Sequence, residues 1–381
     1  MISAETPSEL ERIVLDITDL TPSGDAVGRH EGMVVFVPLV LPGERVEVEI
    51  IHKRKHFWRG RAVQWMTRRL DRVEPPCKYF GRCGGCQLQH LSYRTQLAMK
   101  TGFVREQFAH IGKFDSAPVM ECVAAPAALG YRNRVQFSIG ETGKPGFHPP
   151  RQHGVLDIDE CLIADSYINQ QLKDLISSAV TIEANQIDLR APMQPVRVDD
   201  FDYFVSPQSF FQVNTAQAAN MVRHAVAQLK LTNADHALDL YCGVGLFTLP
   251  MAHQAGYVVG LEVGESSTND ARRNLKGLIE DERARIITAD VGKALGRSDI
   301  ASHGWQAVLL DPPRAGMTYE TMKLLSGLRA KRLVYVSCDP ATLARDARLL
   351  CDSGYELEVV QPFDMFAQTN HVESVATFVR S

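Results

Sequence analysis

The sequence predicts an α/β protein: a C-terminal doubly wound, largely parallel sheet, preceded by a small β-barrel and a central α+β unit. Three observations lead to this prediction. Short apolar runs alternate with helical segments after Gln208, period-2 alternation with Gly and Pro turns fills residues 11–70, and a cysteine-rich segment separates the two patterns. At 381 residues, the chain is long enough for two or three domains.

The bulk composition is that of an ordinary globular protein, with 45% hydrophobic and 23% charged residues. No window approaches the roughly 18 to 20 apolar residues that span a membrane, and the N-terminus lacks the organisation of a secretory signal. We therefore expect a cytoplasmic protein. A net charge of -4 excludes a uniformly basic surface but allows a local basic groove.

Residues 1–72 are predicted to form an antiparallel barrel of the OB type. Their strand-like runs are ERIVLDITDL, GDAVGRHEGMVVFVPLV, ERVEVEIIHKR and GRAVQWM. Residues 53–72 are rich in cations and interleave Phe57, Trp58 and Trp65. Such a run suits either an RNA surface, with contacts to phosphates and bases, or simply a solvated basic strand pair.

Residues 73–205 form the predicted central α+β unit, with a helix at about 92–111 that is a candidate to pack on the C-terminal domain. Cys77, Cys83 and Cys86 follow C-x5-C-x2-C, and Cys161 lies far downstream. Three clustered thiolates and one distant thiolate suit a four-iron, four-sulfur cluster, and four thiolates suit zinc equally well. The spacing leaves both metals open. Of the remaining cysteines, Cys242 lies within the LDLYCGVG motif, and Cys122 and Cys351, which belong to no motif, are predicted to be buried packing residues.

Residues 206–381 form the predicted parallel-sheet domain, whose strands run through LDLYCGVG, VVGLE, IITAD, AVLLDPP and VYVSCDP. Ligands in such sheets bind at the carboxyl ends of the strands, where the motifs of this segment fall. Gly243 and Gly245 allow a tight turn close to a ligand, and Glu262 ends the next strand, where an acid accepts ribose hydroxyls. A nucleoside site and a dinucleotide site share these features.

Three further segments carry reactive groups. DPPRAG is a stiff loop after a buried strand that presents Asp311 and Arg314, and Cys338 ends the following strand. Glu373 lies in an apolar stretch, where burial favours a role as a base, although a buried cap or an ion-pair partner fits equally well. His371 suits ring stacking, proton relay or plain packing.

Several motifs together carry a family resemblance. GDAVGRHEGMVVFVPLVLPGERVEVEI resembles the TRAM module, an RNA-binding barrel. FFQVN, DLYCGVG, DPPRAG, SCDPATLARD and FDMFAQTNHVES resemble, in this order and spacing, the bacterial uracil-5-methyltransferases of 23S ribosomal RNA and tRNA. The resemblance spans nearly the whole chain. It implies a Rossmann-like class I methyltransferase domain that uses S-adenosylmethionine, and Asp290, after the third strand, agrees with a site for this donor.

The resemblance also implies residue roles. Cys338 is the expected nucleophile, which adds to uracil carbon 6, and Glu373 is the expected base, which removes the proton from carbon 5. The expected donor contacts are Gln212, Tyr241, Glu262, Asp290 and Asp311. Asp311 is alternatively placed to hold the uracil edge. Members of the family with a cluster imply a 4Fe-4S centre at Cys77, Cys83, Cys86 and Cys161, with a structural or RNA-positioning role.

The chain departs from the family pattern at three places. Asp339 follows the cysteine where many relatives have Asn, FAQT replaces the more usual FPHT, and Leu246 stands where some relatives use Asn. Asp339 and FAQT remove no group that the mechanism requires, and Leu246 is not counted as a donor contact.

The barrel and the cysteine cluster favour 23S rRNA over tRNA, because tRNA-specific bacterial relatives tend to lack both. The target uridine must be unpaired or flipped out to reach the thiolate, and we expect a monomer. A non-catalytic RNA clamp has no need of Cys338 or Glu373. A radical methylthiotransferase requires C-x3-C-x2-C, and a dinucleotide oxidoreductase leaves SCDPATLARD unexplained.

Overall fold

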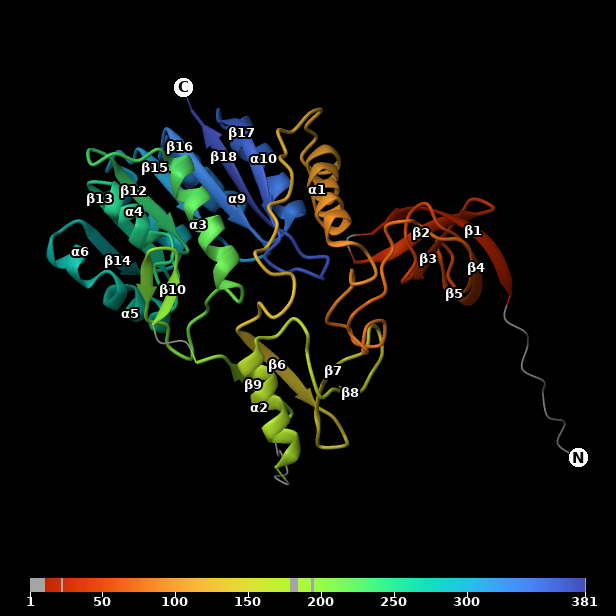
Figure 1. Cartoon of the computed structure of the whole chain (residues 1–381). Coiled ribbons are helices and arrows are strands. Elements are labelled where there is room, and N and C mark those ends of the chain that lie inside the picture. Colours follow the sequence, from red (N-terminus) through yellow and green to blue (C-terminus); the bar gives the residue numbers. More distant parts are fainter. Residues whose placement is uncertain (1–10, 22, 179–183, 193–194, 381) are drawn as a thin grey trace, which may run out of the picture. The chain divides into compact units, whose positions relative to one another are not determined.

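The computed structural model describes residues 11–21, 23–178, 184–192 and 195–380 (Figure 1). The chain divides into two units. Of the described residues, the first contains those up to 96 together with 138–158 and 368–370, and the second contains the others. The domain boundaries expected at 72/73 and 205/206 stay predictions. Among the described residues, no helix combines the length and the apolar character that crossing a membrane requires.

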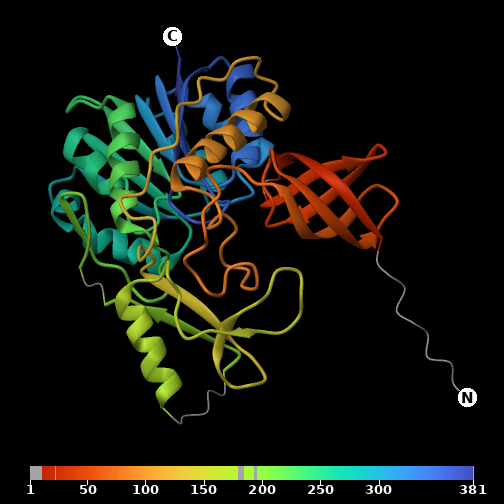
Figure 2. The same cartoon turned by 45° about the vertical axis from the view of Figure 1, so that its right-hand side comes forward.

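The first unit contains the barrel expected from the strand-like runs (Figure 2). Its strands are β1 (Arg12–Leu20), β2 (Asp25–His30), β3 (Met33–Pro38), β4 (Arg45–Lys53) and β5 (Trp58–Thr67), closed in the order β1-β2-β3-β5-β4. Ile13, Leu15 and Ile17 alternate into the interior, as a period of two requires. The barrel is not purely antiparallel as predicted, because β3 and β5 pair in parallel to close it.

The rest of the first unit is largely loops and short strands. The cysteine-rich segment lies here, and β7 (Pro145–Phe147) pairs with β8 (Leu156–Asp157) and with the end of β6 (Arg134–Ile139). Gly84 donates its N–H to the carbonyl of His148 (3.1 Å), which ties the cysteine segment to this hairpin.

A seven-stranded sheet is the frame of the second unit, in the order β14-β13-β12-β15-β16-β18-β17. The parallel strands are β12 (His236–Leu240), β13 (Tyr257–Glu262), β14 (Ala284–Thr288), β15 (Ala307–Leu310) and β16 (Arg332–Ser337). β17 (Glu356–Phe363) and β18 (Glu373–Val379) join as an antiparallel pair, and β18 lies between β16 and β17. The predicted doubly wound sheet is thus present, with an antiparallel addition at one edge.

Helices cover both faces of this sheet (Figure 1). One face packs on α1 (Tyr93–His110), α7 (Val291–Leu295), α9 (Tyr319–Gly327) and α10 (Pro340–Asp352), and the other on α3 (Thr215–Leu229), α4 (Thr248–Gln254) and α5 (Glu265–Asn274). Successive residues of β15 show the alternation: Val308 and Leu310 belong to the first layer of core, Ala307 and Leu309 to the second. Parallel strands buried on both faces explain the continuous apolar runs of the sequence.

The remaining elements of the second unit are short. They are α2 (Ser166–Ser177), β9 (Gln186–Arg190), β10 (Val196–Val198), β11 (Phe201–Tyr203), α6 (Lys276–Glu280) and α8 (Ser298–Ala301). Local capping sets several helix starts. Asn214 accepts the N–H of Gln217 at the start of α3, and Asp165 accepts that of Tyr167 at the start of α2.

Candidate functional site

The carboxyl edge of the parallel strands gathers most of the predicted donor and catalytic residues. Because neighbouring parallel strands end at the same edge, residues far apart in the sequence come together there. Glu262 ends β13. Tyr241, Asp311 and Cys338 directly follow β12, β15 and β16, and Asp290 lies two residues after the end of β14.

The glycine-rich turn after β12 has the backbone conformation that its sequence predicts. Tyr241, Gly243 and Gly245 have φ values of 63°, 54° and 87°. A Cβ at Gly245 would lie 2.7 Å from Leu275 Cδ1, whereas a Cβ at Gly243 would meet no atom of the described residues within 4 Å apart from its chain neighbours. Gly245 is therefore required for packing on α5, while Gly243 leaves space beside the turn for a ligand.

Glu262 and Asp290 are held in place by the backbone. Glu262 accepts the N–H of Gly243 (3.2 Å) and of Gly264 (2.7 Å), one at each carboxylate oxygen, and Asp290 accepts the N–H of Lys293 (3.0 Å) at the start of α7. Burial and the nearby Asp290 carboxylate raise the pKa of Tyr241 to about 12, so the Tyr241 hydroxyl is neutral. Each carboxylate oxygen retains lone pairs for a ligand.

Gln212 lies in a loop anchored at both ends. Its side chain is buried and its carbonyl accepts the amide of Asn133 (3.1 Å). Asp270 of α5 binds the start of the loop by accepting the N–H and the hydroxyl of Ser206 (2.8 and 2.7 Å) and the hydroxyl of Ser209 (2.6 Å). The position of Gln212 therefore depends on the same helix that packs on the glycine turn.

Cys338 and Glu373 are neighbours because β18 pairs antiparallel with β16. Ser337 of β16 lies opposite Ser374 of β18. Because the strands are antiparallel, Cys338, which follows Ser337, lies beside Glu373, which precedes Ser374. Glu373 is only 5% exposed. Burial raises its pKa to about 8; Asp311 adds to this shift and Arg314 opposes it. The carboxyl group thus has the raised pKa of a general base that works near neutral pH.

Arg314 is the residue whose role the sequence did not reveal. Burial and the Glu373 carboxylate raise the pKa of Cys338 to about 11, and Arg314 lowers it through its charge and a hydrogen bond to the thiol. Burial also raises the pKa of Asp311 to about 7. Arg314 is the cation that favours the thiolate, and the DPPR motif was the available signal for it.

Helix α10 holds the DPPRAG loop against the cysteine strand. Gly316 has φ 73°, and a Cβ there would lie 2.3 Å from Thr342 Cγ2. Thr342 donates its hydroxyl to the carbonyl of Arg314 (3.0 Å), Asp346 accepts the N–H of Met317 (3.2 Å), and Arg345 donates to two further carbonyls of this segment. The SCDPATLARD motif therefore positions the loop as well as supplying the cysteine.

The three departures from the family pattern fit this structure. Asp339 caps α10 by accepting the N–H groups of Ala341 and Thr342 (3.0 and 2.9 Å), a role that Asn fills equally well. Leu246 is buried, and Ala367 in FAQT is buried with its carbonyl accepting the hydroxyl of Tyr131 (3.0 Å).

His371 lies in the segment that precedes Glu373. Its ring meets Phe366 edge-on at 5.9 Å. Burial, and after it the charge of Arg314, lower the pKa of His371, so the ring is neutral at physiological pH. A neutral imidazole suits stacking or hydrogen bonding better than charge pairing.

Asp239 is a second residue that the sequence reasoning missed. It is fully buried at the end of β12, and Thr248 donates to its Oδ2 (2.5 Å). Among the described residues Oδ1 has no hydrogen-bond partner, and burial raises the pKa of Asp239 to about 8. A buried carboxyl oxygen without a partner beside a ligand turn is a candidate acceptor for a hydrogen bond from a ligand.

The segment before Glu373 is anchored by a buried ion pair. Lys100 of α1 donates to Asp364 and to the carbonyl of Phe366 (3.0 Å), and the side chains of Lys100 and Asp364 are both 0% exposed. Helix α1 therefore fixes the backbone that leads into β18.

The cysteine cluster is not shown as a metal site. Cys77, Cys83 and Cys86 are half-buried in the first unit, and Cys161 belongs to the second. Across the part of the chain that the structure describes, no three His, Cys, Asp or Glu side chains form a group that could hold a metal ion. Gly85 does donate its N–H to the Cys83 sulfur (3.3 Å).

The basic segment of the barrel stacks cations on aromatic rings. Lys53 Nζ lies 4.0 Å from the ring centre of Trp58, and the guanidinium of Arg68 lies 5.2 Å from that of Trp65. Of the cations in this segment, Lys53 and Arg61 are about half and two-thirds exposed. The arrangement suits RNA contact, which stays a prediction.

Comparisons with known proteins agree with this geometry. The sequence profile of the tRNA (Uracil-5-)-methyltransferase family matches residues 185–380, which contain every predicted donor and catalytic residue. The profile of the TRAM domain matches residues 11–63, which form most of the barrel.

Relatives match over the full length. An uncharacterized RNA methyltransferase of Caldanaerobacter subterraneus is 31% identical over 97% of this chain and 98% of its own, and one of Halalkalibacterium halodurans is 30% identical over 96% of each. The crystal structure of Pyrococcus abyssi tRNA (uracil-54, C5)-methyltransferase in complex with S-adenosyl-L-homocysteine superposes with a TM-score of 0.72 and 27% identity, covering 96% of this chain and all of that one.

Proposed function

This chain belongs to the tRNA (uracil-5-)-methyltransferase family, and from that premise we propose that it methylates carbon 5 of one uridine in 23S rRNA. The family makes the chain an S-adenosylmethionine-dependent RNA uracil-5-methyltransferase with an N-terminal TRAM barrel. The ribosomal target and the covalent mechanism are the proposed parts.

The residues at the carboxyl edge fit the methyl donor. Glu262 has the position and the lone pairs for the ribose hydroxyls, and the open side of Gly243 allows close approach of the donor. Oδ1 of Asp239, which has no hydrogen-bond partner among the described residues, can accept a hydrogen bond from the donor, for example from its ammonium group. Gln212, Tyr241, Asp290 and Asp311 complete the proposed contacts. Bound there, S-adenosylmethionine supplies an electrophilic methyl group.

The proposed chemistry uses four residues of one cluster. The Cys338 thiolate, favoured by Arg314, adds to carbon 6 of uracil and makes carbon 5 nucleophilic enough to take the methyl group. Glu373 then removes the proton from carbon 5, and the thiolate leaves as the carbon 5–carbon 6 double bond reforms. Asp311, with its pKa raised to about 7, is suited either to the donor or to the uracil edge.

One observation carries this mechanism more than any other. Glu373 is a buried carboxyl group with a raised pKa, placed next to a cysteine by strand pairing and facing a cation from a third segment. A non-catalytic clamp has no use for a buried carboxyl group that is costly to ionise.

Support for the ribosomal target comes from the chain's accessory parts. The TRAM barrel with its cation–aromatic surface suits a large structured RNA, and we propose a monomer in the cytoplasm. A tRNA target is the second candidate, because the archaeal protein that superposes over nearly the whole chain is a tRNA (uracil-54, C5)-methyltransferase.

We also propose a 4Fe-4S cluster on Cys77, Cys83, Cys86 and Cys161. Four thiols are the right donor chemistry, and the N–H of Gly85 at the Cys83 sulfur is the kind of bond that supports a ligating thiolate. The cluster's part is structural, since methyl transfer consumes no electrons.

Methyl transfer from labelled S-adenosylmethionine to unmodified 23S rRNA and to tRNA tests the proposal, with mass spectrometry to locate the product. We expect 5-methyluridine at one ribosomal position. Methylation of tRNA alone would agree with the proposed mechanism but reject 23S rRNA as the substrate. Transfer to neither RNA would favour a non-catalytic clamp.

A further inference from the structure

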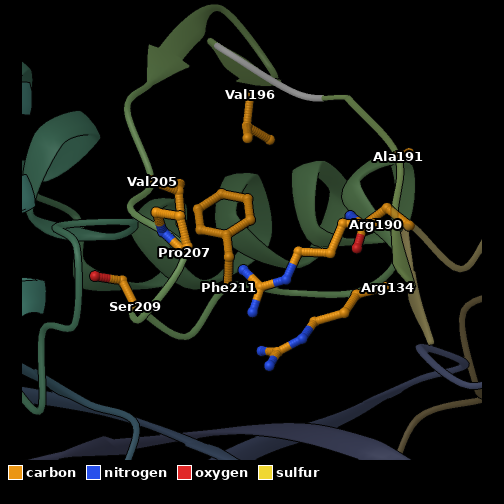
Figure 3. Close-up of a pocket in the computed structure, with 9 residues that line it drawn as sticks. Arg134, Arg190, Ala191, Val196, Val205, Pro207, Ser209 and Phe211 are labelled. Atoms are coloured by element: carbon orange, nitrogen blue, oxygen red, sulfur yellow. The ribbon is translucent and has the colours of Figure 1, made fainter. Parts of the chain in front are cut away.

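A pocket of about 200 Å³ in the second unit contains none of the residues assigned above to the donor or the target (Figure 3). Val196, Val205 and Pro207 line its apolar side, and Arg134 and Arg190 bring charge. In Figure 3 the ring of Phe211 lies between Pro207 and the Arg190 side chain. The space suits a group the size of one nucleotide rather than a large ligand.

The two arginines share a single carboxylate. Arg134 donates from Nε and Nη2 to Asp188 (3.0 and 2.9 Å), and Arg190 donates from the same two atoms (3.1 and 2.9 Å). Burial raises the pKa of Asp188, but the arginine hydrogen bonds outweigh it and hold the pKa below its ordinary value, so Asp188 stays charged. Two cations and one anion leave a net charge of +1 at the pocket.

The two arginines carry more positive charge than one ion pair with Asp188 requires. One arginine is enough to pair Asp188, and the second adds an uncompensated cation beside apolar carbon and an aromatic face. Asp188 fixes both guanidiniums, and the side chains of Arg134 and Arg190 are still 40% and 31% exposed. Fixed guanidinium groups beside an aromatic ring are the combination that binds phosphate and stacks a base in single-stranded nucleic acid.

The pocket also adjoins the catalytic site along the chain. Phe211 directly precedes Gln212, and the loop that carries both is anchored by Asp270. The ring of Phe211 is supported on another side by Tyr203, with ring centres 5.9 Å apart. A base stacked on Phe211 would therefore lie on the loop that also positions the proposed donor contact.

We infer that this pocket binds a nucleotide flanking the target uridine, with its phosphate on Arg134 and Arg190 and its base on Phe211. The inference rests on the proposed RNA substrate, and it names a subsite that helps to bring the target into register with Cys338.

Equilibrium binding of a labelled, uridine-rich single-stranded RNA at several salt concentrations tests the subsite. Arg190→Gln should weaken binding about tenfold, as expected for one charge-assisted contact, and should lower the slope of log affinity against log salt by about 0.7. Phe211→Leu keeps apolar volume but loses the stacking face, so it should weaken binding several-fold with the slope unchanged.

Arg297→Gln is the matched control. Arg297 and Arg285 share Asp299 as Arg190 and Arg134 share Asp188, but they line no part of this pocket. RNA binding by Arg190→Gln equal to that of Arg297→Gln overturns the subsite, whatever the methylation assay shows. Weakened S-adenosylmethionine binding with unchanged RNA binding also overturns it and assigns the pocket to the donor. The expected RNA-binding losses without any methyl transfer by the wild type support the subsite and reject the proposed activity.

Discussion

The surroundings of Cys338 favour the neutral thiol over the thiolate. Burial and the adjacent Glu373 raise its pKa to about 11 from an ordinary 9.0, and Arg314 is the cation that counters them. At neutral pH the resting thiol is protonated, so the proposed nucleophile, the thiolate, forms only when its proton has an acceptor. A protonated thiol is also protected from oxidation, because oxidants react with the thiolate and not with the thiol.

Replacing Cys338 by Ala should abolish turnover, with a loss on the order of 10⁴-fold or more, as for other removed nucleophiles. Donor binding should be unchanged, because the sulfur is assigned to the RNA base. Methyl transfer to RNA and calorimetric binding of S-adenosylmethionine measure the two effects. Cys351→Ala is the control, since Cys351 is a half-buried thiol near the end of α10 with no role at the site. Turnover by Cys338→Ala would reject the covalent mechanism.

Glu373 should make one step of the reaction depend on pH. Its pKa is raised to about 8, so the carboxyl group is protonated below that pH and can accept the carbon 5 proton only above it. Resolution of the protein–RNA adduct should therefore accelerate as pH rises from about 7 to about 9. Glu373→Gln should accumulate the adduct on denaturing gels at every pH. A variant that shows no adduct would remove Glu373 from the role of base.

The raised pKa of Glu373 also makes the stability of the fold depend on pH. A carboxyl group whose folded pKa lies above its unfolded value of 4.5 stabilises the fold only while protonated, and this contribution is lost as pH rises through about 8. Glu373→Gln should therefore unfold at a higher temperature than the wild type above pH 8, and the difference should shrink toward about pH 5. An equal difference at both ends of this range would mean that ionisation of Glu373 is not its cause.

At the level of elements, the ion pair of Lys100 and Asp364 connects α1 to the segment before β18. Removing one partner leaves a buried charge uncompensated, so Lys100→Met should cost about 3 to 5 kcal/mol of stability. Lys100→Met combined with Asp364→Leu should recover much of that loss, because it removes both charges. Urea unfolding of the single and double variants measures the difference.

A positioning role for this pair predicts more than lost stability. In the double variant, the rate of adduct resolution should fall relative to adduct formation, because Glu373 follows the anchored segment. If a stable double variant forms and resolves the adduct at wild-type rates, the ion pair contributes to stability and does not position Glu373.

At the level of the whole molecule, the proposed cluster predicts a visible property. Protein purified without oxygen should be brown and absorb near roughly 400 nm, and Cys83→Ser should reduce both colour and bound iron. Iron and acid-labile sulfide analysis provides the count. Colourless protein with stoichiometric zinc would assign the four thiols to zinc instead.

Much of the fold was predictable because its determinants are local. Period-2 alternation predicted the barrel strands, apolar runs before Gly or Pro turns predicted the parallel strands, and the expected helix at 92–111 is α1, Tyr93–His110. The barrel's closure was not predictable in the same way. The alternation of buried and exposed residues along β3 and β5 does not depend on which strand each one pairs with. The sequence pattern therefore could not predict their parallel contact.

By itself, the sequence determined which residues end the parallel strands, and hence that Glu262, Asp311 and Cys338 share one edge, because strand direction follows from the alternating order of strands and helices. Only the tertiary structure decided that Glu373 lies beside Cys338, that Arg314 reaches the thiol and that Arg134 and Arg190 share one aspartate. These relations join residues separated by many turns of chain, and no local periodicity encodes them. They depend on which strand inserts between β16 and β17 and on how α10 packs the DPPRAG loop.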